Sequence, residues 1–248
     1  MRLVVIGATG RTGGEIVAEA AERAHDVVGV ARSAGEVGDV PVHPAGELPA
    51  LLADADTDAI IDFTLPEASR EYAARAAEAG VPYVVGTTGF DDDGLAALDA
   101  AAESTAVLKA SNFARGVQAL LQAVKAGVEA LPEYDVELTE THHAGKRDAP
   151  SGTANAFLDA IEAARGETLD RTHGREGKHR REESEVGVHV RRAGTVRGEH
   201  EVVLAGNGEV LTLSHRAESR RVFAAGAVDA AEWLAGREPG WYDFGDVL

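Results

Sequence analysis

The sequence predicts an α/β fold, in which a Rossmann-like parallel sheet forms a nucleotide domain and a smaller α+β domain carries a mixed or antiparallel sheet. The first half of the 248-residue chain alternates short apolar runs with amphipathic segments, as successive βα units do. After about Gly116 this alternation stops, and strand-like runs follow one another directly. A glycine-rich turn, GATGRTG at 7–13, joins the first apolar run to the first helical segment.

The first half contains alternating strands and helices. Its strands are short, nearly continuous apolar runs, which suit a parallel sheet covered on both faces. We predict these strands at Leu3–Ile6, Val27–Ala31, Ala59–Phe63, Tyr83–Val85 and Thr105–Leu108. A first helix at Gly13–Ala24 has apolar residues at helical spacing on one face. Further helices begin at Pro66, where proline is favoured as the first helical residue, and at about Asp92.

The second half contains fewer helices and longer strand-like runs. We predict a helix from about Gly116 to Ala130, a strand at Tyr134–Thr139 and a helix at Thr153–Ala164. A polar, exposed loop at 169–183 follows. Three successive strands, separated by glycine-bearing turns, are then predicted at Glu185–Arg191, Thr195–Leu204 and Glu209–His215. A last helix is predicted at Ala224–Leu234.

The composition excludes several classes of protein. The chain has no cysteine, which excludes disulfides, zinc–thiolate sites and thiol nucleophiles. No apolar run is long enough to span a bilayer, and the N-terminal apolar run is too short for a signal peptide. The 44% hydrophobic content supports a real core. We therefore expect a soluble, cytoplasmic protein that does not associate with membranes.

The charge balance is strongly negative. The 42 acidic residues outnumber the 24 lysines and arginines, which gives a formal charge of −18. This charge repels the phosphate backbone, so we expect no nucleic-acid partner. It fits either an ordinary acidic protein or a halophilic one, in which high internal salt screens the repulsion between surface carboxylates. We favour the halophilic interpretation.

The glycine turn is typical of a nucleotide site. Gly7, Gly10 and Gly13 reproduce a G-x-x-G-x-x-G spacing after a buried strand and before a helix. Such glycines let backbone amides approach a pyrophosphate at the helix N-terminus. Arg32 follows the second strand, where an arginine accommodates the 2′-phosphate of NADPH and a carboxylate would favour NADH. The alternatives are a glycine turn without a ligand and a solvated Arg32.

Two further polar clusters follow predicted strands. They are Gly86-Thr87-Thr88-Gly89 and Ser111-Asn112-Phe113. Ligands of open α/β sheets collect at such strand ends, although either cluster could be only a capped turn between a strand and a helix.

The segment 140–154, ETHHAGKRDAPSGTA, combines adjacent histidines with fixed cations and a turn before a helix. A histidine can donate a proton near neutral pH, and Lys146 supplies a point charge for a carboxylate. The amides and hydroxyls at 151–153 would form an anion site at a helix N-terminus. A structural histidine pair is the alternative. Metal binding is disfavoured, because Lys146 and Arg147 would repel a divalent cation and Glu140 could equally orient His142.

These motifs resemble the 4-hydroxy-tetrahydrodipicolinate reductase (dihydrodipicolinate reductase) family nearly end to end. The matching segments are GATGRTG at 7–13, DFTLPE at 62–67, GTTG at 86–89, SNFARGV at 111–117, HHAGKRDAPSGTA at 142–154, RAGTVRGEH at 192–200, ESRRVFAAGAVDAAEWL at 218–234 and WYDF at 241–244. The resemblance implies NAD(P)H-dependent reduction of a cyclic unsaturated dicarboxylate to tetrahydrodipicolinate, in the diaminopimelate route to lysine. Hydride goes to ring carbon C4 and a proton to C3.

The resemblance also implies roles for individual residues. His142 and Lys146 would be catalytic, and His143, Lys146, Gly152 and Thr153 would bind the substrate carboxylates. The cofactor, NADPH with NADH possible, would be bound by a larger set: Gly7, Ala8, Thr9, Gly10, Arg11, Thr12, Arg32, Gly86, Thr87, Thr88, Ser111, Asn112, Phe113 and Arg220. For Arg220 a structural salt bridge is an equal alternative. No metal is implied.

The family organisation implies a discontinuous dinucleotide-binding domain at 1–113 and 219–248. Residues 114–218 would form the substrate-binding domain, whose sheet assembles a homotetramer. Three departures from the family pattern stand out. Thr12 replaces a methionine, Arg32-Ser33 replaces an acidic residue followed by arginine, and the loop 172–183 follows the family only loosely.

Two other functions share some of these features. Another NAD(P)-dependent amino-acid-linked dehydrogenase would share the first half but would not need the HH-x-x-K and DAPSGT elements. A non-catalytic nucleotide-sensing protein would be expected to lose the histidine–lysine pairing, which is intact here.

Overall fold

The structure, a computed structural model, describes residues 1–53 and 56–248. It divides into two compact units. Unit 1 comprises Met1–Arg115 and Arg220–Leu248, and unit 2 comprises Gly116–Ser219. Unit 1 therefore contains both ends of the chain and differs from the predicted nucleotide domain only at residues 114, 115 and 219.

Unit 1 is built on an eight-stranded sheet with the order β13-β7-β6-β5-β1-β2-β4-β3. Its strands are β1 (Arg2–Ile6), β2 (Asp26–Ala31), β3 (Gly35–Val37), β4 (Val40–Pro44), β5 (Ala59–Asp62), β6 (Tyr83–Val85), β7 (Ala106–Lys109) and β13 (Gly240–Asp243). All neighbouring strands run parallel except β3 and β4. The predicted parallel sheet is confirmed.

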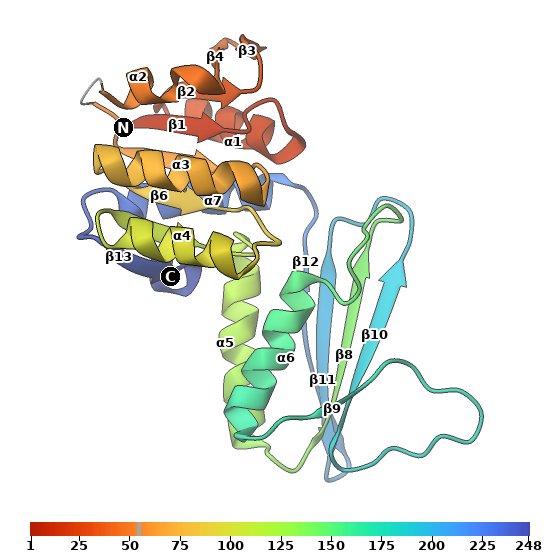
Figure 1. Ribbon diagram of the computed structural model, residues 1–248. Helices are drawn as coiled ribbons and strands as arrows, with labels where there is room; N and C mark the ends of the chain where they lie inside the picture. The colour runs from red at the N-terminus through yellow and green to blue at the C-terminus, as the bar shows by residue number, and fades with distance from the viewer. Residues whose placement is uncertain (54–55) are drawn as a thin grey trace. The chain divides into compact units, whose positions relative to one another are not determined.

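Helices cover both faces of this sheet (Figure 1). They are α1 (Arg11–Glu22), α2 (Leu48–Ala53), α3 (Pro66–Ala79), α4 (Asp92–Ala102) and α7 (Arg221–Leu234), with 3₁₀ turns η1 (Ala45–Glu47) and η2 (Phe244–Val247). Leu3 and Val5 of β1 pack with α1 and α7, whereas Val4 and Ile6 pack with α2, α3 and α4. Because successive strand residues point to opposite faces, a strand covered on both sides must be apolar throughout.

Several elements of unit 1 differ from the prediction. α1 begins at Arg11 rather than Gly13, so the first helical turn includes Arg11 and Thr12. α7 begins at Arg221 rather than Ala224. The short elements β3, β4, α2 and β13 were not predicted. β13 pairs with β7 although Trp241 is 39% exposed, so tertiary pairing rather than a local apolar run defines that strand.

Unit 2 contains a mixed five-stranded sheet with the order β12-β11-β8-β10-β9. Its strands are β8 (Asp135–His142), β9 (Asp170–Thr172), β10 (Glu185–Arg192), β11 (Glu199–Gly206) and β12 (Glu209–Arg216). The helices α5 (Arg115–Ala130) and α6 (Gly152–Arg165) lie on one side of this sheet (Figure 1). α5 packs closely on it, since a Cβ on Gly127 would lie 3.1 Å from Leu204 Cδ1.

The structure corrects the predicted strands of unit 2. β11 begins at Glu199, not Thr195, because the chain turns at Gly194 (φ +47°) and Gly198 (φ +153°) before the strand starts. β10 and β11 follow each other in the chain but are not paired, since β8 lies between them. β8 continues to His142, beyond the predicted end at Thr139. The supposed loop 169–183 contains the short strand β9.

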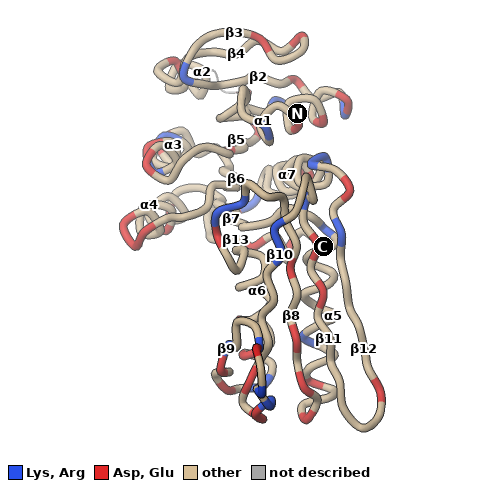
Figure 2. Tube along the Cα trace, turned by 90° about the vertical axis from the view of Figure 1, so that its right-hand side faces the viewer, with Lys and Arg blue, Asp and Glu red and all other residues tan. Residues whose placement is uncertain are grey.

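Acidic residues are distributed over the elements of both units (Figure 2). None of the helices within residues 1–53 and 56–248 is long and apolar enough to cross a membrane.

Candidate active site

The glycine turn lies at the carboxyl end of β1, and two of its positions require glycine. Gly7 has φ +84°, and a Cβ there would lie 2.6 Å from the Phe63 carbonyl oxygen. A Cβ on Gly13 would lie 2.0 Å from the Gly7 carbonyl oxygen. The Gly10 amide donates to that same oxygen at 2.8 Å. The turn is therefore tight, and it exposes the backbone at the start of α1 as a pyrophosphate site requires.

A cavity of about 390 Å³ opens beside this turn. Its lining includes Gly7, Thr9 and Gly10 together with Arg32, which directly follows β2. The structure thus brings four of the predicted cofactor residues to one cavity. The rest of the lining includes Phe63, Leu65 and Tyr72, side chains that sequence reasoning did not select.

The strand order β7-β6-β5-β1-β2 places the other predicted cofactor segments at the same sheet edge. Gly86 follows β6, and its Cα lies so close to the Phe63 ring that a Cβ would be 2.2 Å from Phe63 Cζ. Phe113 follows β7 and packs on Phe63, with ring centroids 5.5 Å apart. The cluster at 86–89 and the cluster at 111–113 therefore both adjoin Phe63.

Three predicted cofactor residues point their side chains into unit 1. Ala8 is fully buried, Phe113 is 2% exposed within the core, and Thr87 is 3% exposed. Thr87 Oγ1 accepts a hydrogen bond from the Thr64 amide at 3.0 Å and is hydrogen-bonded to Ser69 Oγ at 2.9 Å. These three residues can offer a ligand little beyond their backbone atoms.

The remaining predicted residues of unit 1 are more accessible. Arg11, Thr88 and Ser111 are exposed, whereas Thr12, Asn112 and Arg220 are half-buried. The side chain of Asn112 caps its own turn, with Oδ1 accepting from the Ala114 amide at 2.8 Å.

Asp62, at the end of β5, anchors the loops around this cavity. It is fully buried and accepts hydrogen bonds from Thr64 Oγ1 at 2.7 Å, from the Tyr83 hydroxyl at 2.5 Å and from Ser69 Oγ. Burial raises the pKa of Asp62, and the donated hydrogen bonds partly offset that shift. Because Ser69 Oγ is also hydrogen-bonded to Thr87 Oγ1, this network ties the loop after β5 to the loop after β6.

The histidine motif of unit 2 lies where β8 ends and α6 begins. His142 is the last residue of β8 and is 8% exposed. The Lys146 amide donates to the His143 carbonyl oxygen at 3.1 Å, and Lys146 Nζ lies 2.9 Å from Asp148 Oδ1. Burial acts to raise the pKa of Asp148, but the hydrogen bond from Lys146 lowers it below its usual range.

α6 begins directly after this loop. Ser151 is its N-cap, and its Oγ accepts from the Ala154 amide at 3.1 Å. Gly152 is exposed, whereas Thr153 is 7% exposed in the first turn. The first turn of a helix attracts anions through its free amides and its dipole. The structure thus gathers the predicted residues Lys146, Gly152 and Thr153 around one helix N-terminus.

Glu140 lies two residues before His142 on β8 and contacts its imidazole. It is fully buried, and its Oε2 lies 2.5 Å from His142 Nδ1. Arg192 of β10 donates to both carboxylate oxygens, each at 2.8 Å. Burial alone would raise the pKa of Glu140, but the hydrogen bonds from His142 and Arg192 lower that pKa to about 2. Glu140 is therefore ionised at neutral pH.

A third histidine, His200 of β11, completes this cluster. It is 2% exposed, and its ring meets that of His142 edge-on with centroids 5.2 Å apart. Burial, reinforced by the nearby His142, lowers the pKa of His200 to about 3, so this ring is neutral near pH 7. Sequence reasoning did not select His200 or Arg192, although both lie within the motif RAGTVRGEH at 192–200.

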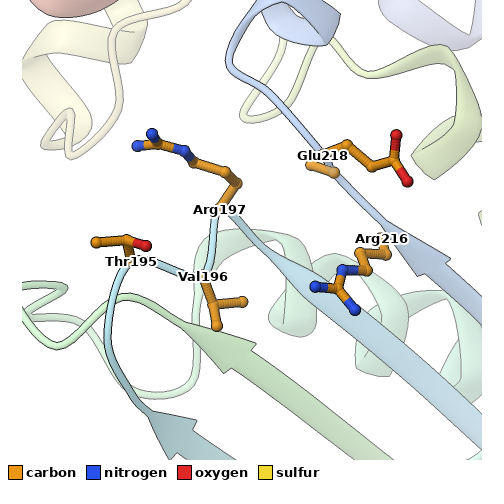
Figure 3. Close-up of a pocket in the computed structure, with 6 residues that line it drawn as sticks. Thr195, Val196, Arg197, Arg216 and Glu218 are labelled. Atoms are coloured by element: carbon orange, nitrogen blue, oxygen red, sulfur yellow. The ribbon is translucent and has the colours of Figure 1, made fainter.

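The loop before β11 approaches the same imidazole. A Cβ on Gly198 would lie 3.2 Å from His142 Nε2, so a larger residue would crowd that nitrogen. A cavity of about 540 Å³ adjoins this loop and is lined by Thr195, Arg197 and Arg216, among others. Figure 3 shows the Arg197 side chain pointing away from Arg216 and Glu218. Within the described residues, no group of three or more histidines and carboxylates is arranged to hold a metal ion.

The glycine-turn cavity and the buried histidine cluster define a two-domain, NAD(P)H-dependent oxidoreductase. One family model, described as dihydrodipicolinate reductase, N-terminus, matches residues 1–113, and a second, described as dihydrodipicolinate reductase, C-terminus, matches residues 116–248. The chain belongs to the dihydrodipicolinate reductase family. The predicted family and enzyme class are confirmed.

Individual relatives agree with this assignment over the full length. The chain is 75% identical over 248 residues to the 4-hydroxy-tetrahydrodipicolinate reductase of Natronomonas pharaonis, covering 100% of both chains. It is 55% identical over 249 residues to that of Haloarcula marismortui, covering 100% of this chain and 98% of the relative.

Solved structures confirm the fold class. The dipicolinate-bound dihydrodipicolinate reductase from Paenisporosarcina sp. TG-14 superposes with a TM-score of 0.80 at 23% identity, covering 100% of this chain and 99% of that one. The aspartate semialdehyde dehydrogenase II from Vibrio cholerae, complexed with ASA, reaches a TM-score of 0.58 at 15% identity, with 94% and 97% coverage. At these identities the likeness concerns the fold alone.

Proposed function

We propose that His142 is the proton donor in the 4-hydroxy-tetrahydrodipicolinate reductase reaction of diaminopimelate and lysine biosynthesis, which this protein catalyses. The observation that carries this assignment is the geometry of His142. Its imidazole is buried at a strand end and held by an ionised carboxylate, beside Lys146 and the first turn of α6. A cyclic dicarboxylate carries negative charges that Lys146 and the first turn of α6 attract.

The proposed nucleotide domain comprises 1–113 and 219–248, and its residues fit a dinucleotide. Gly7 and Gly13 carry no side chain where a Cβ would clash with neighbouring backbone atoms, so the backbone before α1 stays open to a pyrophosphate. Of the other predicted cofactor residues, Arg11, Thr88 and Ser111 have exposed side chains that could reach the ligand. When bound, the reduced nicotinamide supplies a hydride to carbon C4 of the substrate ring.

The proposed substrate domain, 114–218, supplies the proton and the carboxylate contacts. Once the 4-hydroxyl has left as water, C4 gains the hydride and His142 donates a proton to C3, so one hydride and one proton add across the resulting C3–C4 double bond. Lys146, His143, Gly152 and Thr153 bind the two carboxylates. Because Lys146 is paired with Asp148 at 2.9 Å, a substrate carboxylate must share or replace that partner.

Arg32 supports a preference for NADPH over NADH. It is exposed and lines the same cavity as the glycine turn. A guanidinium at the end of the second strand pairs with the 2′-phosphate of NADPH, whereas NADH offers it only hydroxyls. NADH can still bind through the other contacts of the turn.

Arg32→Glu is expected to shift the ratio of kcat/KM for NADPH to that for NADH towards NADH by about 10-fold or more, since a charged hydrogen bond is replaced by repulsion. Steady-state kinetics with both cofactors measure this ratio. Arg70→Glu on α3 is the matched control, because it changes the net charge of unit 1 equally but does not line the cavity. An unchanged ratio in Arg32→Glu would remove Arg32 from the cofactor site.

We also propose that the chain assembles as a homotetramer through the sheet of unit 2. α5 and α6 cover one face of that sheet, so its other face is available for a second copy (Figure 1). β12 lies at an edge of the sheet, and Val210 on it is 66% exposed. Sedimentation equilibrium measures the assembled mass, and a monomeric mass at micromolar concentration would exclude this assembly.

A coupled assay in a series of KCl concentrations tests the proposed activity and the halophilic interpretation together. Aspartate semialdehyde, pyruvate and the preceding synthase generate the substrate, and oxidation of NADPH is recorded. We expect activity that depends on the synthase, and a melting temperature that rises from low to molar KCl because salt screens the repulsion within a chain of charge −18. A melting temperature that falls over this range contradicts salt adaptation, and synthase-independent oxidation contradicts the substrate assignment.

A further inference from the structure

We propose that Glu140 and Arg192 are positioning residues for His142. They keep Nδ1 of the imidazole hydrogen-bonded to Glu140, so that only Nε2 is directed at the substrate and can donate a proton to it. This inference rests on the proposed function and assigns roles to residues outside the substrate contacts described above. It follows from the hydrogen-bond geometry around one buried carboxylate.

Each oxygen of Glu140 accepts two hydrogen bonds. Oε1 accepts from Arg192 Nη2 at 2.8 Å and from the Ser151 amide at 3.0 Å. Oε2 accepts from Arg192 Nη1 at 2.8 Å and lies 2.5 Å from His142 Nδ1. With four hydrogen bonds from three residues, the carboxylate cannot turn without breaking several of these bonds.

The register of the sheet explains why these groups meet. Arg192 of β10 lies opposite His142 of β8, and His200 of β11 lies opposite Glu140. Ser151 reaches the same carboxylate from the start of α6. The clamp therefore joins β10, β8 and α6, and Arg192 also donates to the Asp148 carbonyl oxygen at 2.6 Å.

The second nitrogen of His142 lies beside Gly198, which carries no side chain. Nδ1 is occupied by Glu140, and the ring edge is met by His200. Nε2 faces Gly198, where even one added Cβ would lie 3.2 Å away. A ring flip would exchange Nδ1 for a carbon and forfeit the bond to Glu140. The arrangement therefore favours a single orientation, in which Nε2 is the transferable site.

The charged groups around His142 favour the same proton arrangement. Glu140 and Arg192 form a pair of opposite charges, and Ser151 adds a neutral donor. From β11, His200 presents a neutral ring whose Nε2 lies 3.3 Å from Ser151 Oγ. Beyond the strand end, Lys146 is balanced by Asp148. The proton that remains on His142 after donation is thus held on Nδ1 by the one carboxylate that touches the ring.

The test is Glu140→Gln, which keeps the size of the side chain and removes its charge. We expect kcat to fall about 10- to 100-fold, the range for a misplaced reacting group, while KM for the dicarboxylate changes less than about threefold.

The double variant Glu140→Gln, His142→Gln distinguishes positioning from a general structural role. If Glu140 acts through His142, the double variant is no slower than His142→Gln alone, because the two effects do not add. Glu162→Gln is the matched control, since Glu162 lies on α6 of the same unit and forms an ion pair with Arg171 of β9. It is expected to leave kcat and KM unchanged.

Glu140→Asp covers the case in which Glu140→Gln does not fold, because it keeps the charge that Arg192 needs and withdraws the carboxylate from Nδ1. An intermediate kcat is expected. Wild-type kcat in both Glu140 variants overturns the inference. A double variant that is slower than His142→Gln by the whole factor measured for Glu140→Gln alone also overturns it. If the wild-type protein itself does not reduce the substrate, the proposed function fails instead.

Discussion

His142→Gln is expected to lower kcat by about 10²- to 10⁴-fold, the usual contribution of a positioned general acid. Glutamine fills much of the same space and can still hydrogen-bond to Glu140, but it has no proton to transfer near neutral pH. The clamp of Arg192 and the Ser151 amide on Glu140 does not depend on the imidazole, so the local fold should persist. KM is expected to change little, because Lys146, Gly152 and Thr153 remain.

Steady-state kinetics with NADPH and enzymatically generated substrate measure this loss. His43→Gln is the matched control, because His43 lies on β4 of unit 1, pairs with Glu47 and does not line the nucleotide cavity. It should retain wild-type kcat. A wild-type kcat in His142→Gln would remove His142 from the reaction.

Gly13→Ala is expected to weaken NADPH binding by about 100-fold or more, which corresponds to about 2.7 kcal/mol. The added Cβ would lie 2.0 Å from the Gly7 carbonyl oxygen and 2.7 Å from the Gly7 carbonyl carbon. Both are backbone atoms, so no side-chain rotation can relieve the overlap. Either α1 moves away from the turn or the turn opens, and in both cases the amides lose the geometry that a pyrophosphate requires.

The neighbouring residue provides a stringent control. A Cβ on Gly14 would lie 3.6 Å from the Ala8 carbonyl oxygen, which is ordinary van der Waals contact. Gly14→Ala should therefore bind NADPH normally and gain up to about 1 kcal/mol of stability from its higher helix propensity. Fluorescence titration of NADPH and thermal unfolding of both variants provide the comparison. Equal NADPH affinity in the two variants would show that close packing at Gly13 does not shape the site.

The sequence predicted the candidate site unevenly. Gly7, Gly10, Arg32 and the histidine motif were identifiable because each belongs to a contiguous pattern with its own chemistry. The inward orientation of Thr87 and Phe113 was not, since a residue next to a ligand loop can equally well support that loop from inside. Only the bonds to Thr87 from Thr64 and Ser69, and the packing of Phe113 on Phe63, identify these side chains as supports.

By itself the sequence determined the parallel sheet of unit 1, the glycine turn and the position of the histidine motif between a strand and a helix. Apolar periodicity and glycine spacing act over a few residues, so they can be read without knowing what lies across the sheet. The tertiary structure alone decided that β10 and β11 flank β8. That pairing brings Arg192 to Glu140 across 52 residues of chain and places His200 beside His142. Strand register is set by long-range pairing and packing, which no local pattern in this chain encodes.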